Sequence, residues 1–110
     1  MTNVAPRVFV VQEHPTYDIS HATKFGTIVV VLPPGNITYS IDHAIERMKR
    51  ILDDVTEDDW LLLTGDPIVI GLATHFVAAK LGKVRLLKWN RRDLEYIPMK
   101  LNLSEKPSGQ

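Results

Sequence analysis

The 110-residue chain has the length of one compact domain, and its 45% hydrophobic and 24% charged residues are ordinary for a globular protein. Thirteen basic and thirteen acidic residues give a formal net charge of zero, which removes the basic excess typical of proteins that bind nucleic acids or anionic membranes. The absence of cysteine excludes disulfides and thiolate metal sites, and no apolar run approaches the roughly 18 residues of a membrane span.

The first half of the chain predicts two strands and a helix. Val8–Val11 and Ile28–Leu32 are short, continuous apolar runs, which are typical of strands covered on both faces. The residues between them predict only a short helical turn over Ile19–Lys24. Ser40 is expected to cap a helix over Ile41–Val55. The apolar stripe of this helix consists of Ile41, Ile45, Met48, Leu52 and Val55.

The middle of the chain predicts a third strand and a second helix. Trp60–Leu63 is another buried run, and it leads into a helix over about Pro67–Leu81 that has almost no polar face. A helix that is apolar all round is usually buried. Because a domain this small has little interior, we expect homodimerisation through this helix. Gly82 is expected to end it in the left-handed conformation.

The last two predicted strands form a hairpin. Val84–Trp89 and Tyr96–Leu103 are joined by a charged turn at Asn90–Glu95, and Pro98 is tolerated best on an edge strand. The element order predicts a small three-layer, Rossmann-like α/β domain with a mostly parallel central sheet, a C-terminal antiparallel β-hairpin and two main helices. We expect a single domain at 1–103 and a disordered tail at 104–110.

Three loops follow the carboxyl ends of predicted parallel strands, where open α/β sheets bind their ligands. The loops are Gln12–His14, Pro33–Asn36 and Thr64–Asp66. We expect them to converge on one edge of the sheet. The candidate ligand-binding residues on these loops are Glu13, His14, Asn36, Thr64, Gly65 and Asp66.

The turn at Thr64–Pro67 supports two interpretations. It reads first as a capped corner, because Asp66 suits the N-cap, Pro67 suits the first helical position and Gly65 permits a tight turn. The alternative is that the helix amides and the Thr64 hydroxyl bind an anion such as phosphate. Neither the dinucleotide fingerprint nor the P-loop pattern is present, and Asp66 repels a phosphate.

The sequence offers no complete catalytic or metal-binding arrangement. Glu13 beside His14 is a candidate general-base pair, but both side chains reach one site only where the strand has already ended. His21 falls in a loop, His43 on a helix surface and His75 inside the buried helix, and their spacings match no zinc pattern. We predict no catalytic residue, no metal and no cofactor.

A local basic concentration surrounds Trp89. A base-stacking aromatic beside cations is a feature of proteins that bind single-stranded nucleic acid. A solvated hairpin tip has the same composition, so both interpretations stand. The candidate nucleic-acid-binding residues are Lys88, Trp89, Arg91 and Arg92.

Residues 61–103 carry a distinctive pattern: an apolar strand, a GDP turn, an alanine-rich helix, then LLKW, a short charged turn and Y-x-P. In this pattern the chain resembles small proteins encoded by tailed phages and prophages, a resemblance that implies the host-cell cytoplasm but supplies no activity. The strand–TG–helix arrangement also looks like the ligand-binding edge of CRISPR-associated Rossmann-fold sensor domains, which dimerise and bind cyclic oligonucleotides. Asp66 stands here in place of that family's second glycine, without the basic residue beside it.

Three function hypotheses follow. The first is a non-enzymatic binding or interaction module, a phage-type accessory protein that acts as a homodimer and contacts a protein partner. The second is a nucleotide-binding or nucleotide-cleaving domain that uses the turn at 64–67 to hold a small anionic ligand. The third is a single-stranded nucleic-acid binder that uses the hairpin at 88–92. The N-terminal segment has no signal-peptide pattern, so we expect a cytoplasmic protein without a membrane partner.

Overall fold

The computed structural model describes residues 5–36 and 40–104 of the chain, and within them it shows a five-stranded sheet with two α-helices and two short 3-10 helices. The elements in chain order are β1 (Arg7–Gln12), η1 (Ser20–Phe25), β2 (Thr27–Leu32), α1 (Ile41–Ile51), η2 (Leu52–Asp54), β3 (Trp60–Leu62), α2 (Pro67–Leu81), β4 (Lys83–Asn90) and β5 (Glu95–Asn102). No helix in these residues is both long enough and apolar enough to cross a membrane.

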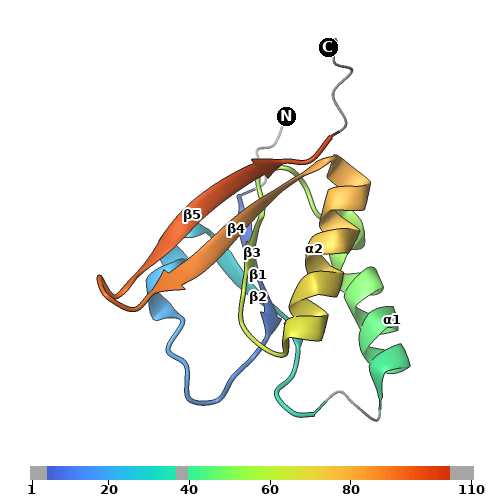
Figure 1. Ribbon diagram of the computed structural model, residues 1–110, viewed down its shortest axis with the longest axis horizontal. Helices are drawn as coiled ribbons and strands as arrows, with labels where there is room; N and C mark the ends of the chain where they lie inside the picture. The colour runs from blue at the N-terminus through green and yellow to red at the C-terminus, as the bar shows by residue number, and fades with distance from the viewer. Residues whose placement is uncertain (1–4, 37–39, 105–110) are drawn as a thin grey trace.

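The strand order in the sheet is β2-β1-β3-β4-β5 (Figure 1). The first four strands run parallel, and β5 returns antiparallel to β4. The predicted mostly parallel α/β sheet with a C-terminal hairpin is therefore confirmed. The direction of the chain through the sheet reverses between β1 and β3, and ligands of open α/β sheets bind beside such a reversal.

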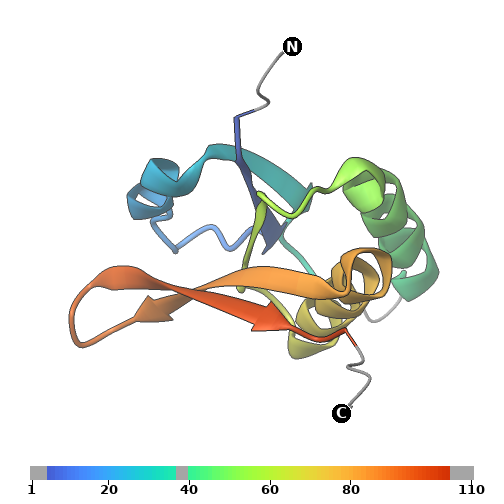
Figure 2. The ribbon, with the colours of Figure 1, turned by 90° about the horizontal axis from the view of Figure 1, so that it is seen from above.

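Helices cover both faces of the sheet, which explains the continuous apolar runs. The helices α1 and α2 lie on one face and η1 lies on the other (Figure 2). Side chains of β1 alternate between the two resulting cores: Phe9 and Val11 pack with α1 and α2, whereas Val8 and Val10 pack on the side of η1. A strand buried on both faces needs apolar residues at every position, so no alternation is visible in its sequence.

The ends of α2 follow the predicted capping chemistry. The Asp66 carboxylate accepts a hydrogen bond from the Ile68 N–H at 2.8 Å, and Pro67 occupies the first turn. At the other end Gly82 has φ +74° and its N–H donates to Ala78 O at 2.7 Å. A Cβ at Gly82 would collide with the Ser104 hydroxyl. The helix therefore spans the predicted residues.

Two predicted details of the helices are wrong. The regular part of α1 ends at Ile51 rather than Val55, because the chain tightens into η2 and Val55 is already extended (φ −61°, ψ 141°). The tightened turn brings Asp54 within reach of Arg7. The Ser40 side chain makes no capping hydrogen bond to α1.

One face of α2 packs on the sheet, and its outward face is open to solvent in the single chain. Val69, Ala73 and Val77 face the sheet and are buried. Gly71, His75 and Ala79 follow each of these by two residues, about 200° around the helix, and are exposed. His75 is therefore not a core residue of the single chain, and its place at a dimer interface stays a prediction. Two of these three outward residues, Gly71 and Ala79, are small, and the homodimer that would cover this face stays a prediction.

Both edges of the sheet carry protection against further strand pairing. Leu63 N–H donates to Leu87 O, so the polar groups of Leu87 point toward β3 and its pairing with Pro98 is not hydrogen-bonded. The imide nitrogen of Pro98 consequently faces the free edge of β5, where it removes a donor, as predicted for an edge proline. On the opposite edge, Arg47 Nε donates to Val31 O at 2.7 Å.

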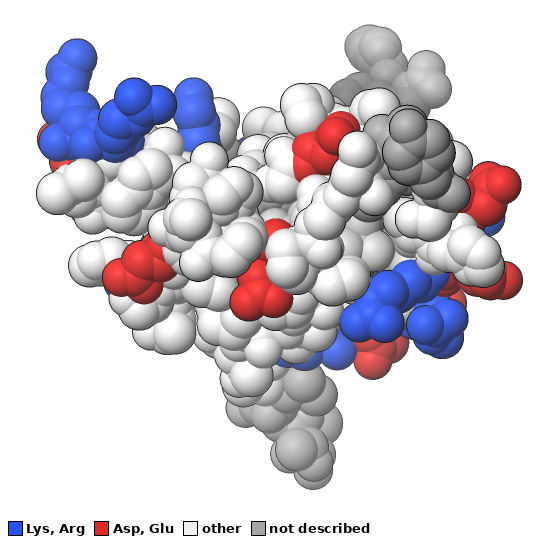
Figure 3. Space-filling model, turned by 90° about the horizontal axis from the view of Figure 1, so that it is seen from below, with Lys and Arg blue, Asp and Glu red and all other residues white. Residues whose placement is uncertain are grey.

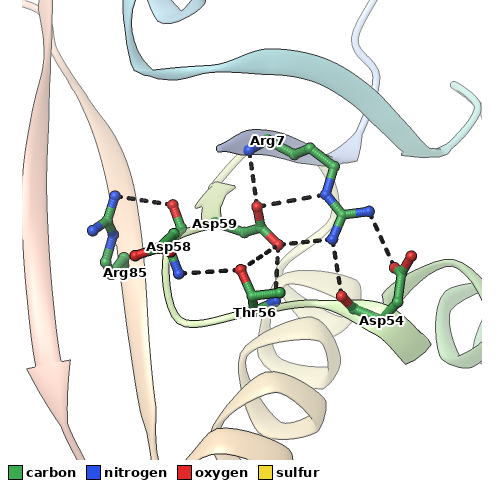
Figure 4. A network of polar contacts seen from close by, with 6 residues as sticks. All are labelled: Arg7, Asp54, Thr56, Asp58, Asp59 and Arg85. Carbon is green, nitrogen blue, oxygen red and sulfur yellow. Dashed lines mark hydrogen bonds and ion pairs between the residues drawn. The ribbon is translucent and has the colours of Figure 1, made fainter. Parts of the chain in front are cut away.

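A polar network fastens the start of β1 to the segment before β3 (Figure 4). The Arg7 guanidinium donates to Asp59 Oδ2 at 2.9 Å and to Asp54 Oδ1 at 3.1 Å, and the Thr56 N–H donates to Asp59 Oδ2 at 2.8 Å. Burial alone raises the pKa of Asp59, but the hydrogen bonds from Arg7 and Thr56 outweigh burial and hold that pKa below its ordinary value. This network stabilises the end of the sheet that lies away from the ligand-binding loops.

The predicted disordered tail begins with an anchored residue. Ser104 Oγ donates to Gly82 O at 3.0 Å, and Ser104 N–H donates to Asn102 Oδ1 at 3.1 Å. These contacts hold residue 104 against the C-terminal end of α2. Residues 105–110 of the predicted tail lie outside the described residues.

Candidate ligand-binding cleft

The three loops expected to bind a ligand do meet, and the buried side chain of Gln12 joins them. Gln12 Nε2 donates to Gly35 O at 2.8 Å and to Pro33 O at 3.3 Å, and its Oε1 accepts a hydrogen bond from the Asp66 N–H at 2.9 Å. Sequence reasoning placed Gln12 in the first loop without a role. The sequence feature that could have identified Gln12 is a single amide side chain directly after a buried apolar strand.

The turn after β3 is occupied by internal hydrogen bonds. The buried Thr64 hydroxyl donates to Gln12 O at 2.8 Å, and the Asp66 and Ile68 amides donate to side chains of the protein itself. Gly65 has φ +112°, and a Cβ there would collide with the Gln12 side chain. These three donors are therefore engaged within the protein, as the capped-corner interpretation expects.

Beside this turn lies a pocket of about 600 Å³ that includes Glu13, His14, Gly65 and Asp66. Two carboxylates and no Lys or Arg line it among the described residues, so a phosphate is repelled there. Asn36 is not part of this group: it lines a separate pocket of about 200 Å³ near the start of α1. The pocket therefore brings together four of the six predicted loop residues, whereas Thr64 lines the neighbouring cleft.

That neighbouring cleft, with a volume of about 580 Å³, opens between the segment 16–21 and the β4–β5 hairpin. Its volume is within the range of small-molecule sites, which are mostly apolar with a few polar groups. We call it the aromatic cleft, and its lining residues are Thr16, Tyr17, Asp18, His21, Leu63, Thr64, Trp89, Arg91, Leu94 and Tyr96.

The rings of the aromatic cleft come from distant parts of the chain. Trp89 and Tyr96 form a cross-strand pair with centroids 4.9 Å apart at 63°, and His21 lies 6.0 Å from Trp89. Trp89 is 36% exposed, so part of its indole is open to a ligand. Burial and the nearby Asp18 carboxylate raise the pKa of Tyr96, so its hydroxyl stays protonated at neutral pH.

A strained residue forms the outer wall of this cleft. Leu94 has φ +54°, a left-handed conformation that is uncommon for leucine, and its side chain is 62% exposed. The Asn90 side chain organises the same turn, since it accepts a hydrogen bond from the Arg92 N–H at 3.0 Å and donates to Asp93 at 2.9 Å. Residues held in such backbone conformations cluster at ligand-binding sites.

Charge is divided over the face that carries both cavities. Figure 3 looks at the edge where the parallel strands end: acidic side chains are scattered over its middle, and basic side chains gather at the hairpin end and beside α1. Arg91 lines the cleft on the hairpin side, and Asp18 lines it from the segment 16–21. The Ser20 N–H donates to Asp18 Oδ1 at 2.9 Å and lowers the pKa of Asp18.

Sequence reasoning identified part of this cleft. Of the four predicted nucleic-acid-binding residues, Trp89 and Arg91 line it, whereas Lys88 and Arg92 do not. Lys88 alternates with Trp89 along β4 and so points to the opposite face of the hairpin. Tyr17 and Asp18 were missed because their segment has no helical or strand period. In the described part of the chain no group of three or more His, Cys, Asp or Glu side chains is placed to hold a metal ion.

Comparisons with curated proteins and with solved structures find no match, so the likeness to CRISPR-associated sensor domains stays a prediction. The model of one protein family, described as "Phage Pam3 gp32-like protein", matches residues 6–103. This range contains every strand and helix of the structure, and the predicted resemblance to small phage proteins is confirmed. The chain belongs to the phage Pam3 gp32-like protein family.

Proposed function

We propose that this phage protein is a non-enzymatic binding module that holds the base of a nucleotide in the aromatic cleft. The observation that carries the proposal is the ring-lined cavity of about 580 Å³ with Arg91 at its side. The proposal moves the nucleotide hypothesis from the turn at 64–67 to the neighbouring cleft. It also includes two residues of the nucleic-acid hypothesis, Trp89 and Arg91.

Stacking supplies the main attraction for a base. An aromatic side chain contributes about 1–3 kcal/mol per stacked base, whatever the base, because every base has a π face. Trp89 and Tyr17 both line the cleft and are both exposed, so each presents ring surface that the protein itself does not cover. Leu63 and Leu94 provide apolar walls that suit the weakly hydrated face of a base.

The charges indicate where the phosphate of such a ligand lies. Glu13 and Asp66 in the adjacent pocket repel an anion, whereas the hairpin end carries Arg92, which lies outside the cleft. We therefore orient the phosphate toward the hairpin end. A longer single strand would leave the cleft in the same direction.

The imidazoles near the cleft favour binding over catalysis. A catalytic imidazole is ordinarily oriented by a hydrogen bond to a carboxylate. In the described residues the His14 ring instead stacks on Tyr17 at 4.0 Å, and its Nδ1 lies 2.9 Å from the Thr16 hydroxyl. The Asp18 carboxylate accepts its hydrogen bond from Ser20 rather than from His21.

Isothermal titration calorimetry with the four nucleoside 5′-monophosphates tests the proposal. We expect saturable binding at low salt that weakens at least about tenfold in Trp89→Ala, the loss of roughly one stacked base. Met99→Ala is the matched control, because Met99 is exposed on the other face of the same hairpin. Absence of binding by all four nucleotides at millimolar concentration would refute the proposal.

We also retain the homodimer through α2 as a proposal, with the host-cell cytoplasm as its setting. The supporting observation is Ile68, a large apolar side chain that is 59% exposed at the start of the helix. The small residues Gly71 and Ala79 on the same outward side permit a second helix to approach closely. Light scattering coupled to size-exclusion chromatography measures the mass directly.

A further inference from the structure

We infer that the aromatic cleft selects guanine among the bases, with Asp18 accepting hydrogen bonds from the guanine N1–H and N2–H groups and Arg91 donating to its O6 and N7. This inference rests on the proposed nucleotide binding and adds the identity of the base. It is carried by one acid and one arginine that line the same ring-walled cavity from opposite segments of the chain.

Asp18 has the free acceptor capacity that this role requires. An ionised carboxylate offers about four acceptor positions. The Ser20 N–H uses one of them, on Oδ1, and that bond also fixes the carboxylate at the start of η1. Asp18 is exposed and lines the cleft together with Tyr96, whose pKa its negative charge helps to raise, so the carboxylate is accessible to a base that enters the cleft.

Guanine is the base whose edge fits a carboxylate best. Its N1–H and N2–H groups are adjacent parallel donors, so they match the two oxygens of a carboxylate in the bidentate manner of an arginine. Adenine presents an unprotonated N1 at the same place, which repels the carboxylate. Cytosine and uracil each present a single donor position there, beside acceptors.

Arg91 complements the other edge of the same base. In the described part of the chain its guanidinium has no hydrogen bond or ion pair, and it lines the cleft from the hairpin side. Arginine bonded to guanine O6 and N7 is the commonest specific contact between a side chain and a base. Guanine is the common base that offers two donors to a carboxylate on one edge and two acceptors to a guanidinium on the adjacent edge.

The test compares the binding of GMP, IMP and AMP to the full chain and to Asp18→Asn by calorimetry. We expect GMP to bind at least about tenfold tighter than AMP, with IMP between them because inosine lacks the 2-amino group. Asp18→Asn is expected to lose most of this preference, with the remainder due to Arg91, and to keep its affinity for AMP, since an asparagine oxygen still accepts the Ser20 N–H. Asp53→Asn, an exposed acid outside the cleft, controls for net charge.

The outcomes separate the inference from the function beneath it. Equal, Trp89-dependent binding of GMP and AMP would overturn the guanine preference and leave nucleotide binding standing. A GMP preference that is undiminished in Asp18→Asn would also overturn it. Failure of all three nucleotides to bind would refute the proposed function, and the inference with it.

Discussion

Gln12 and Asp66 are joined across the point where the strand order reverses: Gln12 Oε1 accepts a hydrogen bond from the Asp66 N–H at 2.9 Å. The same amide donates to Gly35 O, so one buried side chain holds the end of β1, the turn after β2 and the start of α2. In this fold the crevice where ligands of open sheets usually bind is bridged by the protein's own glutamine, which also lines the pocket beside it.

We therefore expect Gln12→Glu to be destabilising. The substitution keeps the length of the side chain but turns a carboxylate oxygen toward Gly35 O and Pro33 O, where a donor is required. The expected loss in the free energy of unfolding is about 2–3 kcal/mol, measured by urea denaturation. Glu13→Gln, a change on the exposed neighbouring residue, should alter stability by no more than about 0.5 kcal/mol. A Gln12→Glu variant as stable as the wild type would show that the junction needs no donor.

The network of Arg7 and Asp59 predicts how stability depends on acid. The pKa of Asp59 in the folded protein lies below its ordinary value of 3.8, so the folded state favours the ionised carboxylate. Its contribution is complete above about pH 5 and is lost as the pH falls through the folded pKa. Because the Asp59 side chain is only 2% exposed, we expect Asp59→Asn to cost about 2–3 kcal/mol at neutral pH.

Urea denaturation of Asp59→Asn and wild type from neutral pH down to about pH 3 measures this effect. The difference between the two proteins should be constant near neutrality and should narrow in acid. Asp54→Asn is the control, because Asp54 contacts the same guanidinium while its side chain is 74% exposed, and its effect should stay below about 1 kcal/mol. A difference that widens in acid would contradict the assignment.

Replacing Leu94 with glycine is expected to raise the stability of the protein and to lower its affinity for a nucleotide. Glycine adopts the left-handed conformation without strain, so we expect Leu94→Gly to stabilise the protein by about 0.5–1 kcal/mol. The same change removes a wall of the aromatic cleft and should weaken nucleotide binding several-fold. Leu94→Ala should weaken binding equally without any gain in stability. Thermal unfolding and calorimetry on both variants measure the two effects, and a glycine variant with unchanged affinity would remove Leu94 from the site.

The dimer proposal predicts that Ile68→Glu yields a monomer. A glutamate in the first turn of α2 interacts favourably with the helix dipole, so the fold should persist. Ile97→Glu places the same charge on an exposed apolar position of β5 and should leave the mass unchanged. Light scattering reports both masses, and a wild-type protein that is already monomeric at high concentration would refute the dimer.

Local chemistry made most of the fold predictable. The strands were visible as apolar runs because both faces of the sheet are covered, and α2 was bounded correctly because Asp66, Pro67 and Gly82 act within one turn of the helix ends. The side of α2 that faces solvent was not predictable, since it depends on the strand order. The sequence consequently does not distinguish the buried Ala73 from the exposed His75, which follows it by two residues.

The aromatic cleft was only half visible because its walls come from segments about seventy residues apart. Trp89 beside basic residues identified the hairpin as a candidate binding site. Tyr17, in contrast, lies in a stretch without helical or strand periodicity. Gln12 was equally hidden: its partners Gly35 and Asp66 become neighbours only when β1 pairs with both β2 and β3. Contacts of this kind depend on which strands pair in the folded sheet, and the sequence alone does not give that pairing.

The course of the chain also has a practical consequence. The first residues of β1 and the last residues of β5 both lie at the edge of the sheet where the parallel strands begin, since Arg7 pairs with Thr27 and Asn102 pairs with Lys83 (Figure 1). The aromatic cleft lies toward the opposite edge. A fluorophore, a fusion partner or a sensor surface attached at either terminus would therefore leave the cleft facing outward, and every immobilised molecule would present it in the same orientation.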